Sequence, residues 1–244
     1  MRYSIVVVFS FVAIIGCSRR EQMAGITLSS ESTKLADAHV FVDILGKSMK
    51  ASHSGKPVDL IAYRLPDMSL PSGRVVASDG FIMDRDPFTR QVKPLSYPML
   101  LAVAKFDNDE RVAFALIQFS QSPVEKWETA VTESQDLSKL ESDQIYGYGV
   151  DSGTGCFCDA DAKQIFNDAT DPDMRFFSRV TREMDKSYKP TRAWIHISTA
   201  KGSAALFSSG FGDGLYASYF GLDEDGNPVA LLTDFGIVDW PRRP

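Results

Sequence analysis

The sequence predicts an α+β fold: a single domain, residues 35–244, dominated by antiparallel β-sheet with one well-specified amphipathic helix at about residues 172–188. Short apolar runs separated by turn residues recur along most of the chain, which is typical of β-rich domains. Two connections between such runs are short and polar, and short connections join antiparallel neighbours. With 44% hydrophobic residues in 244, the chain can bury a large core. Its net charge of −6 argues against a dedicated nucleic-acid binder.

Two β-hairpins are predicted from their turns. The first joins residues 99–106 to 111–119 through an Asn-Asp pair, and the second joins 215–222 to 229–235 through Asp-Glu-Asp-Gly-Asn. Further strands are predicted at residues 58–63, 74–77, 193–198 and 204–208. Pro66 is expected to interrupt the extended segment that follows residues 58–63, because proline cannot donate to a β-ladder.

The predicted helix has clear ends. Asp171 can cap it, Pro172 suits its first position and Pro190 stops it. Four apolar residues at helical spacing are expected to face the core: Phe177, Val180, Met184 and Tyr188. The opposite side carries a basic stripe of Arg175, Arg179, Arg182 and Lys186. This stripe is either a solvated helix face or a surface for an acidic partner or anionic headgroups. Two weaker helices are predicted at residues 160–168 and 35–45.

The N-terminus has the pattern of an export signal. A short basic start with Arg2 precedes an apolar run at residues 5–15. Eleven helical residues span about 16 Å, short of a hydrocarbon core of about 30 Å, so the run is expected to be a signal peptide. Its end, Ile-Ile-Gly-Cys, resembles the lipobox of bacterial lipoproteins. That resemblance implies removal of residues 1–16 and lipid attachment to Cys17. An ordinary cleaved signal and a permanent transmembrane anchor are the alternatives. With Cys17 lipidated, residues 17–34 are predicted to be a flexible tether between membrane and domain.

The two remaining cysteines, Cys156 and Cys158, are separated by one residue. That spacing disfavours a disulfide between them, so the interpretation with the fewest assumptions is a pair of buried, inert thiols. Pairing of Cys156 with His196 as a nucleophile and base, or a zinc site that also includes Cys158, are the alternatives. Cys-x-Cys lacks the usual zinc-ligand spacing, and neither a metal nor another cofactor is expected.

Two glycine-rich segments are candidates for a functional site. Residues 146–159 contain four glycines together with Asp151 and Asp159, and residues 208–216 carry a second glycine-rich loop around Asp213. The candidate binding or catalytic residues are Asp151, Cys156, Asp159 and Asp213. Oxygen atoms of Asp151, Thr154, Asp159 and Asp161 would suit a hard cation, while sharp turns between strands are the structural alternative.

Several short motifs together resemble an uncharacterised bacterial family, domain of unknown function 4241. They include Leu70-Pro71-Ser72-Gly73, Val75-Val76-Ala77 with Asp79, Ser96-Tyr97-Pro98, Trp127-Glu128, residues 146–159 and residues 207–222. Phe211 and Phe220 stand where the family often has Trp, and Cys158 where it often has Met, which weakens any zinc or redox role for the cysteine pair. The resemblance implies that the two glycine loops matter, but it brings no activity or cofactor.

The sequence therefore predicts a lipid-anchored envelope protein on the periplasmic side of a bacterial membrane. Its partners would be the bilayer, through Cys17, and a protein such as a toxin that it neutralises, because acidic clusters favour encounters with a basic partner. A hydrolase built on Asp151, Asp159 and Asp213, with or without Cys156, is the first alternative, and it requires the two glycine loops to converge. An envelope scaffold is the second alternative.

Overall fold

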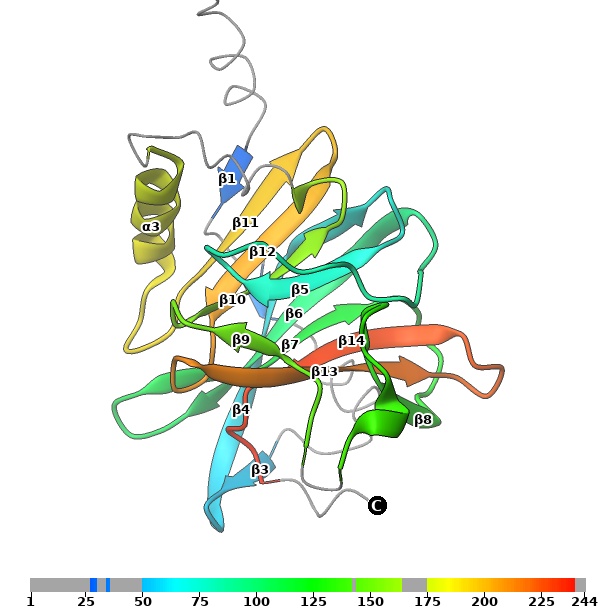
Figure 1. The fold of residues 1–244 in the computed structure, drawn as a ribbon. Helices are drawn as coiled ribbons and strands as arrows, with labels where there is room; N and C mark the ends of the chain where they lie inside the picture. The colour runs from blue at the N-terminus through cyan, green and yellow to red at the C-terminus, as the bar shows by residue number, and fades with distance from the viewer. Residues whose placement is uncertain (1–26, 30–33, 36–49, 142–143, 164–174, 240–244) are drawn as a thin grey trace, which may run out of the picture.

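The structure is a computed structural model that describes residues 27–29, 34–35, 50–141, 144–163 and 175–239. Within these ranges the chain forms two antiparallel β-sheets and one α-helix (Figure 1). The larger sheet has the path β2-β4-β6-β7-β14-β13-β8, with β3 paired to β4 and β9 paired to β13. The smaller sheet has the order β1-β11-β12-β10-β5. The predicted α+β class with a dominant antiparallel sheet is confirmed.

The larger sheet contains both predicted hairpins. Its strands are β2 (Lys34–Leu35), β3 (Lys50–His53), β4 (Lys56–Leu70), β6 (Leu95–Lys105), β7 (Glu110–Gln118), β8 (Lys126–Thr129), β9 (Tyr148–Val150), β13 (Gly214–Leu222) and β14 (Pro228–Asp234). The first hairpin is β6–β7 and the second is β13–β14. Strand β4 continues through Pro66, contrary to prediction, because its ladder with β6 has a register shift between Leu65 and Met68. A bulge of this kind accommodates the missing proline N–H.

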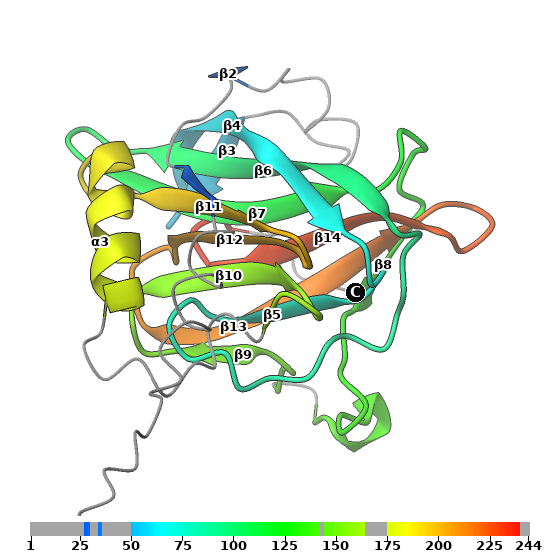
Figure 2. The same ribbon diagram turned by 90° about the horizontal axis from the view of Figure 1, so that it is seen from above.

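The smaller sheet is formed by β1 (Thr27–Ser29), β5 (Val75–Asp79), β10 (Thr154–Asp159), β11 (Trp194–Thr199) and β12 (Gly202–Ser208). Figure 2 shows this sheet stacked against the larger one. Strand β1 pairs with β11, although residues 17–34 were expected to be a flexible tether. The tether that is still predicted therefore ends before Thr27.

Three layers of apolar side chains follow from the alternation of residues along the strands. Phe157 and Phe207 from the smaller sheet meet Leu101 and Ile117 of the larger one between the sheets. Neighbouring residues in the same strands point to the opposite faces. Leu100 and Leu116 belong to an outer cluster on the larger sheet, whereas Cys156, Cys158 and Leu206 belong to one on the smaller sheet.

Helix α3 (Arg175–Ser187) covers the outer face of the smaller sheet. Val180 and Met184 are buried there against Ile195 and Cys156, as predicted. Phe177 and Tyr188, however, are 41% and 53% exposed, so the expectation that they face the core is wrong. The contact stripe of this short helix is narrower than its apolar spacing suggests, and the Phe177 ring packs instead beside Phe81, 4.7 Å away between ring centroids.

Two other helix predictions fall largely outside the described residues. Residues 160–163 form turns, and residues 164–168 are not described. Leu35 belongs to strand β2, and residues 36–45 are not described. In the part of the chain that the structure describes, no helix combines the length and apolar character required to cross a membrane.

Candidate functional site

The two glycine-rich segments lie side by side. Strand β9 pairs with the start of β13, with Val150 opposite Gly214. Beyond this ladder, the Gly153 N–H donates to Asp213 Oδ1 at 2.9 Å, and the Ser209 N–H donates to the Gly153 carbonyl at 3.1 Å. We call this surface, residues 151–153 and 209–215, the glycine-loop face. The convergence of the two loops that the hydrolase hypothesis required is therefore present.

A buried carboxylate fixes the first loop. Asp79, at the end of β5, is 3% exposed. Its Oδ2 accepts the backbone N–H groups of Asp151 and Ser152, both at 2.9 Å, and its Oδ1 accepts the Ser152 hydroxyl at 2.8 Å. The same carboxylate also accepts the N–H groups of Phe81 and Ile82. Five donors on one carboxylate tie the loop to the edge of the smaller sheet.

The second loop is fixed by its own polar groups. Gly212 N–H donates to the Ser209 carbonyl at 2.7 Å, and both the Ser209 and Tyr216 hydroxyls donate to the Gly212 carbonyl at 2.8 Å. Gly210 has φ +54°, and a Cβ there would lie 2.8 Å from the Phe235 carbonyl oxygen. Glycine is required by both the dihedral angle and this close approach. The loop backbone is therefore held in a defined shape.

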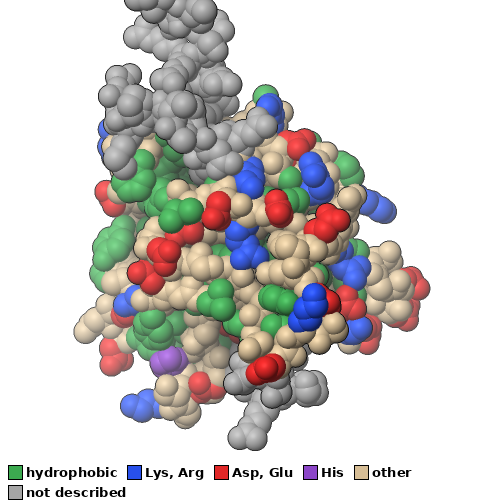
Figure 3. All heavy atoms as spheres, in the orientation of Figure 1, with side chains coloured by type: hydrophobic (Ala, Val, Ile, Leu, Met, Phe, Trp, Pro, Cys, Tyr) green, Lys and Arg blue, Asp and Glu red, His purple; other side chains and the backbone are tan. Residues whose placement is uncertain are grey.

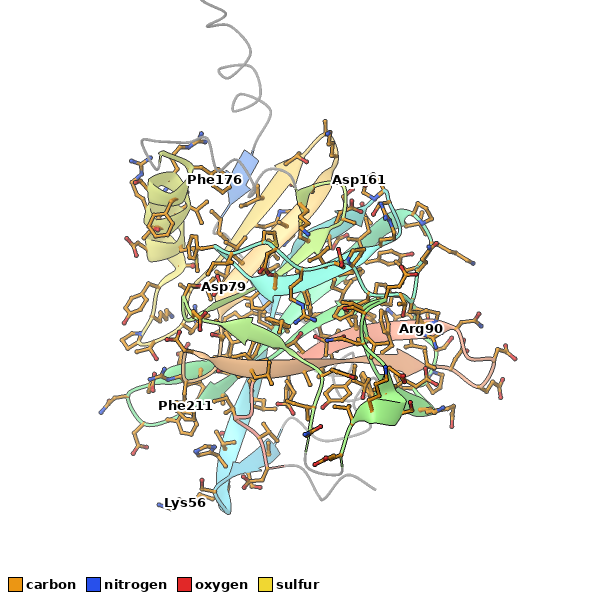
Figure 4. All side chains as sticks on the ribbon, in the orientation of Figure 1. Lys56, Asp79, Arg90, Asp161, Phe176 and Phe211 are labelled. Atoms are coloured by element: carbon orange, nitrogen blue, oxygen red, sulfur yellow. The ribbon has the colours of Figure 1, made fainter. Side chains whose placement is uncertain are left out.

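This rigid loop presents an aromatic side chain to solvent. Phe211 is 57% exposed, and its ring lies 5.5 Å from His53 and 6.3 Å from Phe106 between centroids. The Arg111 guanidinium lies 5.1 Å from the Phe211 ring centroid. Leu215, in the same loop region, is 55% exposed. Figure 3 shows hydrophobic side chains gathered around a histidine in the part of the surface where Figure 4 labels Phe211.

Carboxylates border this aromatic cluster. Asp151 and Asp213 are exposed on the two loops. Burial opposes ionisation of Asp109, but hydrogen bonds from Thr191 and Arg111 lower its pKa below the ordinary value. Backbone N–H groups of Gly55 and Ser54 lower the pKa of Asp239, which lies near His53. The lowered pKa values keep Asp109 and Asp239 ionised at neutral pH, so acidic groups lie at the border of the cluster.

Two predicted site residues lie elsewhere. Asp159 is fully buried at the opposite end of β10, where it accepts the Ser72 N–H and hydroxyl and the Asp161 N–H. Five residue steps of extended chain separate it from Thr154, about 16 Å. The oxygen ligands proposed for a cation are therefore split between two ends of the strand. No group of metal-binding side chains is found among the residues described.

Cys156 is also removed from the glycine-loop face. Its side chain and that of Cys158 are buried under α3, and desolvation raises the pKa of both thiols. His196 alternates with Ile195 and Ile197, which face α3, so the imidazole points to the other side of the sheet. The proposed Cys156–His196 pair and the zinc site are thus wrong, whereas the interpretation as two free buried thiols is confirmed.

The basic stripe on α3 is partly compensated. Lys186 forms an ion pair with Glu183 at 2.6 Å. Arg182 is exposed and Arg179 is half-buried, while the side chain of Arg175 lies outside what the structure describes. Cys17, the predicted site of lipid attachment, also lies outside the described residues. A role for the stripe as a partner surface stays a prediction.

Sequence reasoning missed the residues that build the face. Asp79 entered only as part of a family motif, and Arg111, His53 and Phe106 were not singled out. The available signal for Asp79 was its position between a buried strand and Gly80, where a carboxylate can receive turn N–H groups. The aromatic contacts join residues from β3, the β6–β7 hairpin and the second glycine loop, so they depend on the tertiary fold.

These features define a β-rich α+β domain with a rigid glycine-loop face at one end. Residues 68–233, which include both glycine loops and β5, match the family described as "Protein of unknown function (DUF4241)", and the chain belongs to this family. Comparisons with curated proteins and with solved structures gave no match.

Proposed function

We propose that this protein is a membrane-anchored envelope lipoprotein whose domain binds a protein partner through the glycine-loop face, as a toxin-immunity protein would. The observation that carries the proposal is the 57% exposed Phe211 on a loop whose backbone is fixed by hydrogen bonds. Aromatic side chains dominate the energetics of many protein interfaces. A loop that already has its bound shape loses little conformational entropy on binding.

The border of the face indicates the chemistry of the partner. Asp151 and Asp213 are exposed on the same face as Phe211 and Leu215, and Asp239 lies near His53, whose ring contacts Phe211. An apolar centre with a charged rim is the usual arrangement of a protein interface. Since the rim is acidic, a basic protein is favoured, and charge attraction would accelerate the encounter.

Lipid anchoring has a direct test in the variant Cys17→Ala. We expect this change to block processing of the signal and to release the chain from the membrane fraction, because the thioether attachment site is lost. Cell fractionation with intact-mass measurement checks both effects, and Cys156→Ala is the matched control, since its thiol is buried. An unchanged mature mass and membrane fraction would contradict the anchoring.

Partner binding is tested by affinity capture from envelope extracts of the native host. We expect one basic protein to be retained in equimolar amount, to be lost with Phe211→Ala and to be released by high salt. Leu95→Ala is the control, because Leu95 is 58% exposed but belongs to β6, away from the face. Equal retention by both variants would exclude the glycine-loop face as the binding surface.

The hydrolase alternative is favoured by one observation, the contact between the loops that carry Asp151 and Asp213. It loses Asp159 and Cys156, which are buried within β10. An activity that survives Phe211→Ala but disappears with Asp151→Asn or Asp213→Asn would favour this alternative over the binding module. Retention of no equimolar partner in the absence of such activity would favour an envelope scaffold.

A further inference from the structure

The chain enters the domain at the end opposite the glycine-loop face. Thr27, the first described residue, pairs with Ser198, next to the turn that joins β11 to β12 and carries Ala200 and Lys201. The second glycine loop follows the other end of β12, after Ser208. Six residue steps of β12 separate these two ends, about 20 Å. Figure 1 shows β1 beside the β11–β12 hairpin, away from the start of β13.

The segment before Thr27 limits how far this end can lie from a membrane. Ten residue steps separate Cys17 from Thr27. A flexible segment of that length has a mean end-to-end distance of about 17 Å, and about 36 Å when fully extended. The mean is shorter than the 20 Å between the two ends of β12. At this mean distance, a chain anchored at Cys17 brings the Thr27 end of the domain closer to the bilayer than Phe211.

The Thr27 end carries basic and apolar side chains. Gly202, beside Lys201, lies against Pro71, and an open hollow of about 450 Å³ is lined by Pro71, Ala160, Asp161, Ala200 and Lys201. The Val92 N–H donates a hydrogen bond to the Gly73 carbonyl. This contact brings Lys93, which follows Val92, near Arg74, which follows Gly73. Leu95 pairs with Leu70 and is 58% exposed.

Three exposed basic side chains lie at this end. We call Arg74, Lys93, Leu95 and Lys201 the basic end, and all four side chains are exposed. Asp161 contacts Arg74 at 3.2 Å, an exposed pair that leaves other guanidinium donors available. Figure 3 shows Lys and Arg side chains, with acidic ones between them, in the upper right of the surface where Figure 4 labels Asp161. The protein as a whole carries a net charge of −6, so a group of three exposed basic side chains is notable at this end.

We propose that the basic end docks on an anionic bilayer surface and holds the glycine-loop face pointing away from the membrane. The proposal rests on the anchoring at Cys17. Lysine and arginine attract anionic headgroups, and an exposed leucine among them can enter the interface between headgroups and acyl chains. Since the tether keeps the bilayer within reach of this end, each contact is effectively intramolecular, and weak contacts are sufficient to orient the domain.

Fluorescence quenching in vesicles tests this orientation. A bimane label is placed at position 200 (Ala200→Cys) or at position 211 (Phe211→Cys) of the full chain. The buried Cys156 and Cys158 thiols, whose pKa is raised, should react slowly with the reagent. Each chain is reconstituted in vesicles of phosphatidylcholine with 30 mol% phosphatidylglycerol, about one lipid in three anionic, and with nitroxide headgroups. We expect strong quenching at position 200 and little at position 211.

Charge reversal tests whether the basic side chains cause the docking. The triple variant Arg74→Glu, Lys93→Glu and Lys201→Glu should reduce the ratio of docked to undocked domains about tenfold or more. Vesicles of pure phosphatidylcholine should give the same loss. The matched control reverses three exposed lysines elsewhere, Lys56, Lys105 and Lys189, and should leave quenching at position 200 high.

The outcomes distinguish a failure of the anchoring from a failure of the docking. A chain that does not float with the vesicles contradicts the anchoring and the docking that depends on it. A chain that floats but shows equal quenching at both positions contradicts the docking alone. Equal loss of quenching in the charge-reversed variant and its control would also overturn the assignment of docking to the basic end.

Discussion

The Asp79 carboxylate accepts both the backbone N–H and the hydroxyl of Ser152, at 2.9 and 2.8 Å, although 73 residues separate the two in sequence. This pair joins the end of β5 in the smaller sheet to the loop between β9 and β10. Because Gly153 in turn contacts Asp213 and Ser209, the position of the second glycine loop depends on the same carboxylate. Asp79 thus positions the glycine-loop face without being exposed on it.

Replacing Asp79 should therefore affect both stability and binding. Asp79→Ala leaves five donors without their acceptor, and we expect a loss of about 3 kcal/mol in the free energy of unfolding. Urea denaturation measures this loss. Asp107→Ala, which removes an exposed carboxylate, is the control and should change stability by less than about 0.5 kcal/mol. Similar values for the two variants would refute the anchoring role of Asp79.

The thiols of Cys156 and Cys158 should be unreactive in the folded protein. Burial raises the pKa of both, so almost no thiolate is present at neutral pH. In a titration with a thiol-specific disulfide reagent, neither thiol should react in buffer, and both should react in concentrated urea. Rapid reaction of either thiol without denaturant would mean that the layer between α3 and the smaller sheet is open.

Stability should fall on mild acidification because of His196. Burial lowers the pKa of this imidazole below its ordinary value of 6.5. The unfolded chain then binds a proton at a pH where the folded chain does not, so the free energy of unfolding decreases as pH drops below about 6.5. The free energy of unfolding should stop decreasing for this reason once the pH is below the folded-state pKa of His196. Nearby Asp67 opposes the shift without reversing it.

Urea denaturation between pH 8 and pH 5 tests this expectation. The variant His196→Gln should lose much of the decrease, whereas His53→Gln should keep it, because His196 is still present. A decrease of the same size in His196→Gln would assign the pH dependence to other groups.

Arg192 should not tolerate lysine. Its guanidinium is 3% exposed, stacks on Tyr63 and Trp194 at 4.8 and 4.3 Å, and pairs with Glu110 at 2.9 Å. Lysine keeps the charge but loses the planar stacking, so we expect Arg192→Lys to cost about 2–3 kcal/mol in thermal or urea unfolding. Arg64→Lys is the control, because this half-buried arginine forms an ion pair with Asp67 near the surface, and the change should be nearly neutral. A neutral effect at position 192 would contradict the importance of this stack.

The two long hairpins of the larger sheet were predictable because the residues of their own turns determine them. The Asn-Asp and Asp-Glu-Asp-Gly-Asn turns identified β6–β7 and β13–β14, and the helix signals before Pro190 identified α3. The narrow contact stripe of α3 was not predictable, because spacing alone does not show how far a neighbouring sheet reaches. Phe177 and Tyr188 were assigned to the core for that reason.

The candidate site was only half predicted. Glycine content brought residues 146–159 to attention as one loop, but Cys156 and Cys158 lie within β10, whose extension separates Asp151 from Asp159. The strand tendency of Thr-Gly-Cys-Phe-Cys was the signal that was missed. Phe211 became important only when the fold placed Arg111, Phe106 and His53 around it.

Site-specific photo-crosslinking in intact cells tests the central claim most directly. A photoreactive phenylalanine analogue at position 211 should form an adduct with one discrete basic protein, whereas the same analogue at position 95 should not. The proposed docking predicts lipid adducts at position 95 instead. Absence of a protein adduct at position 211, or the same protein adduct at both positions, would contradict the account of the glycine-loop face as a partner-binding surface.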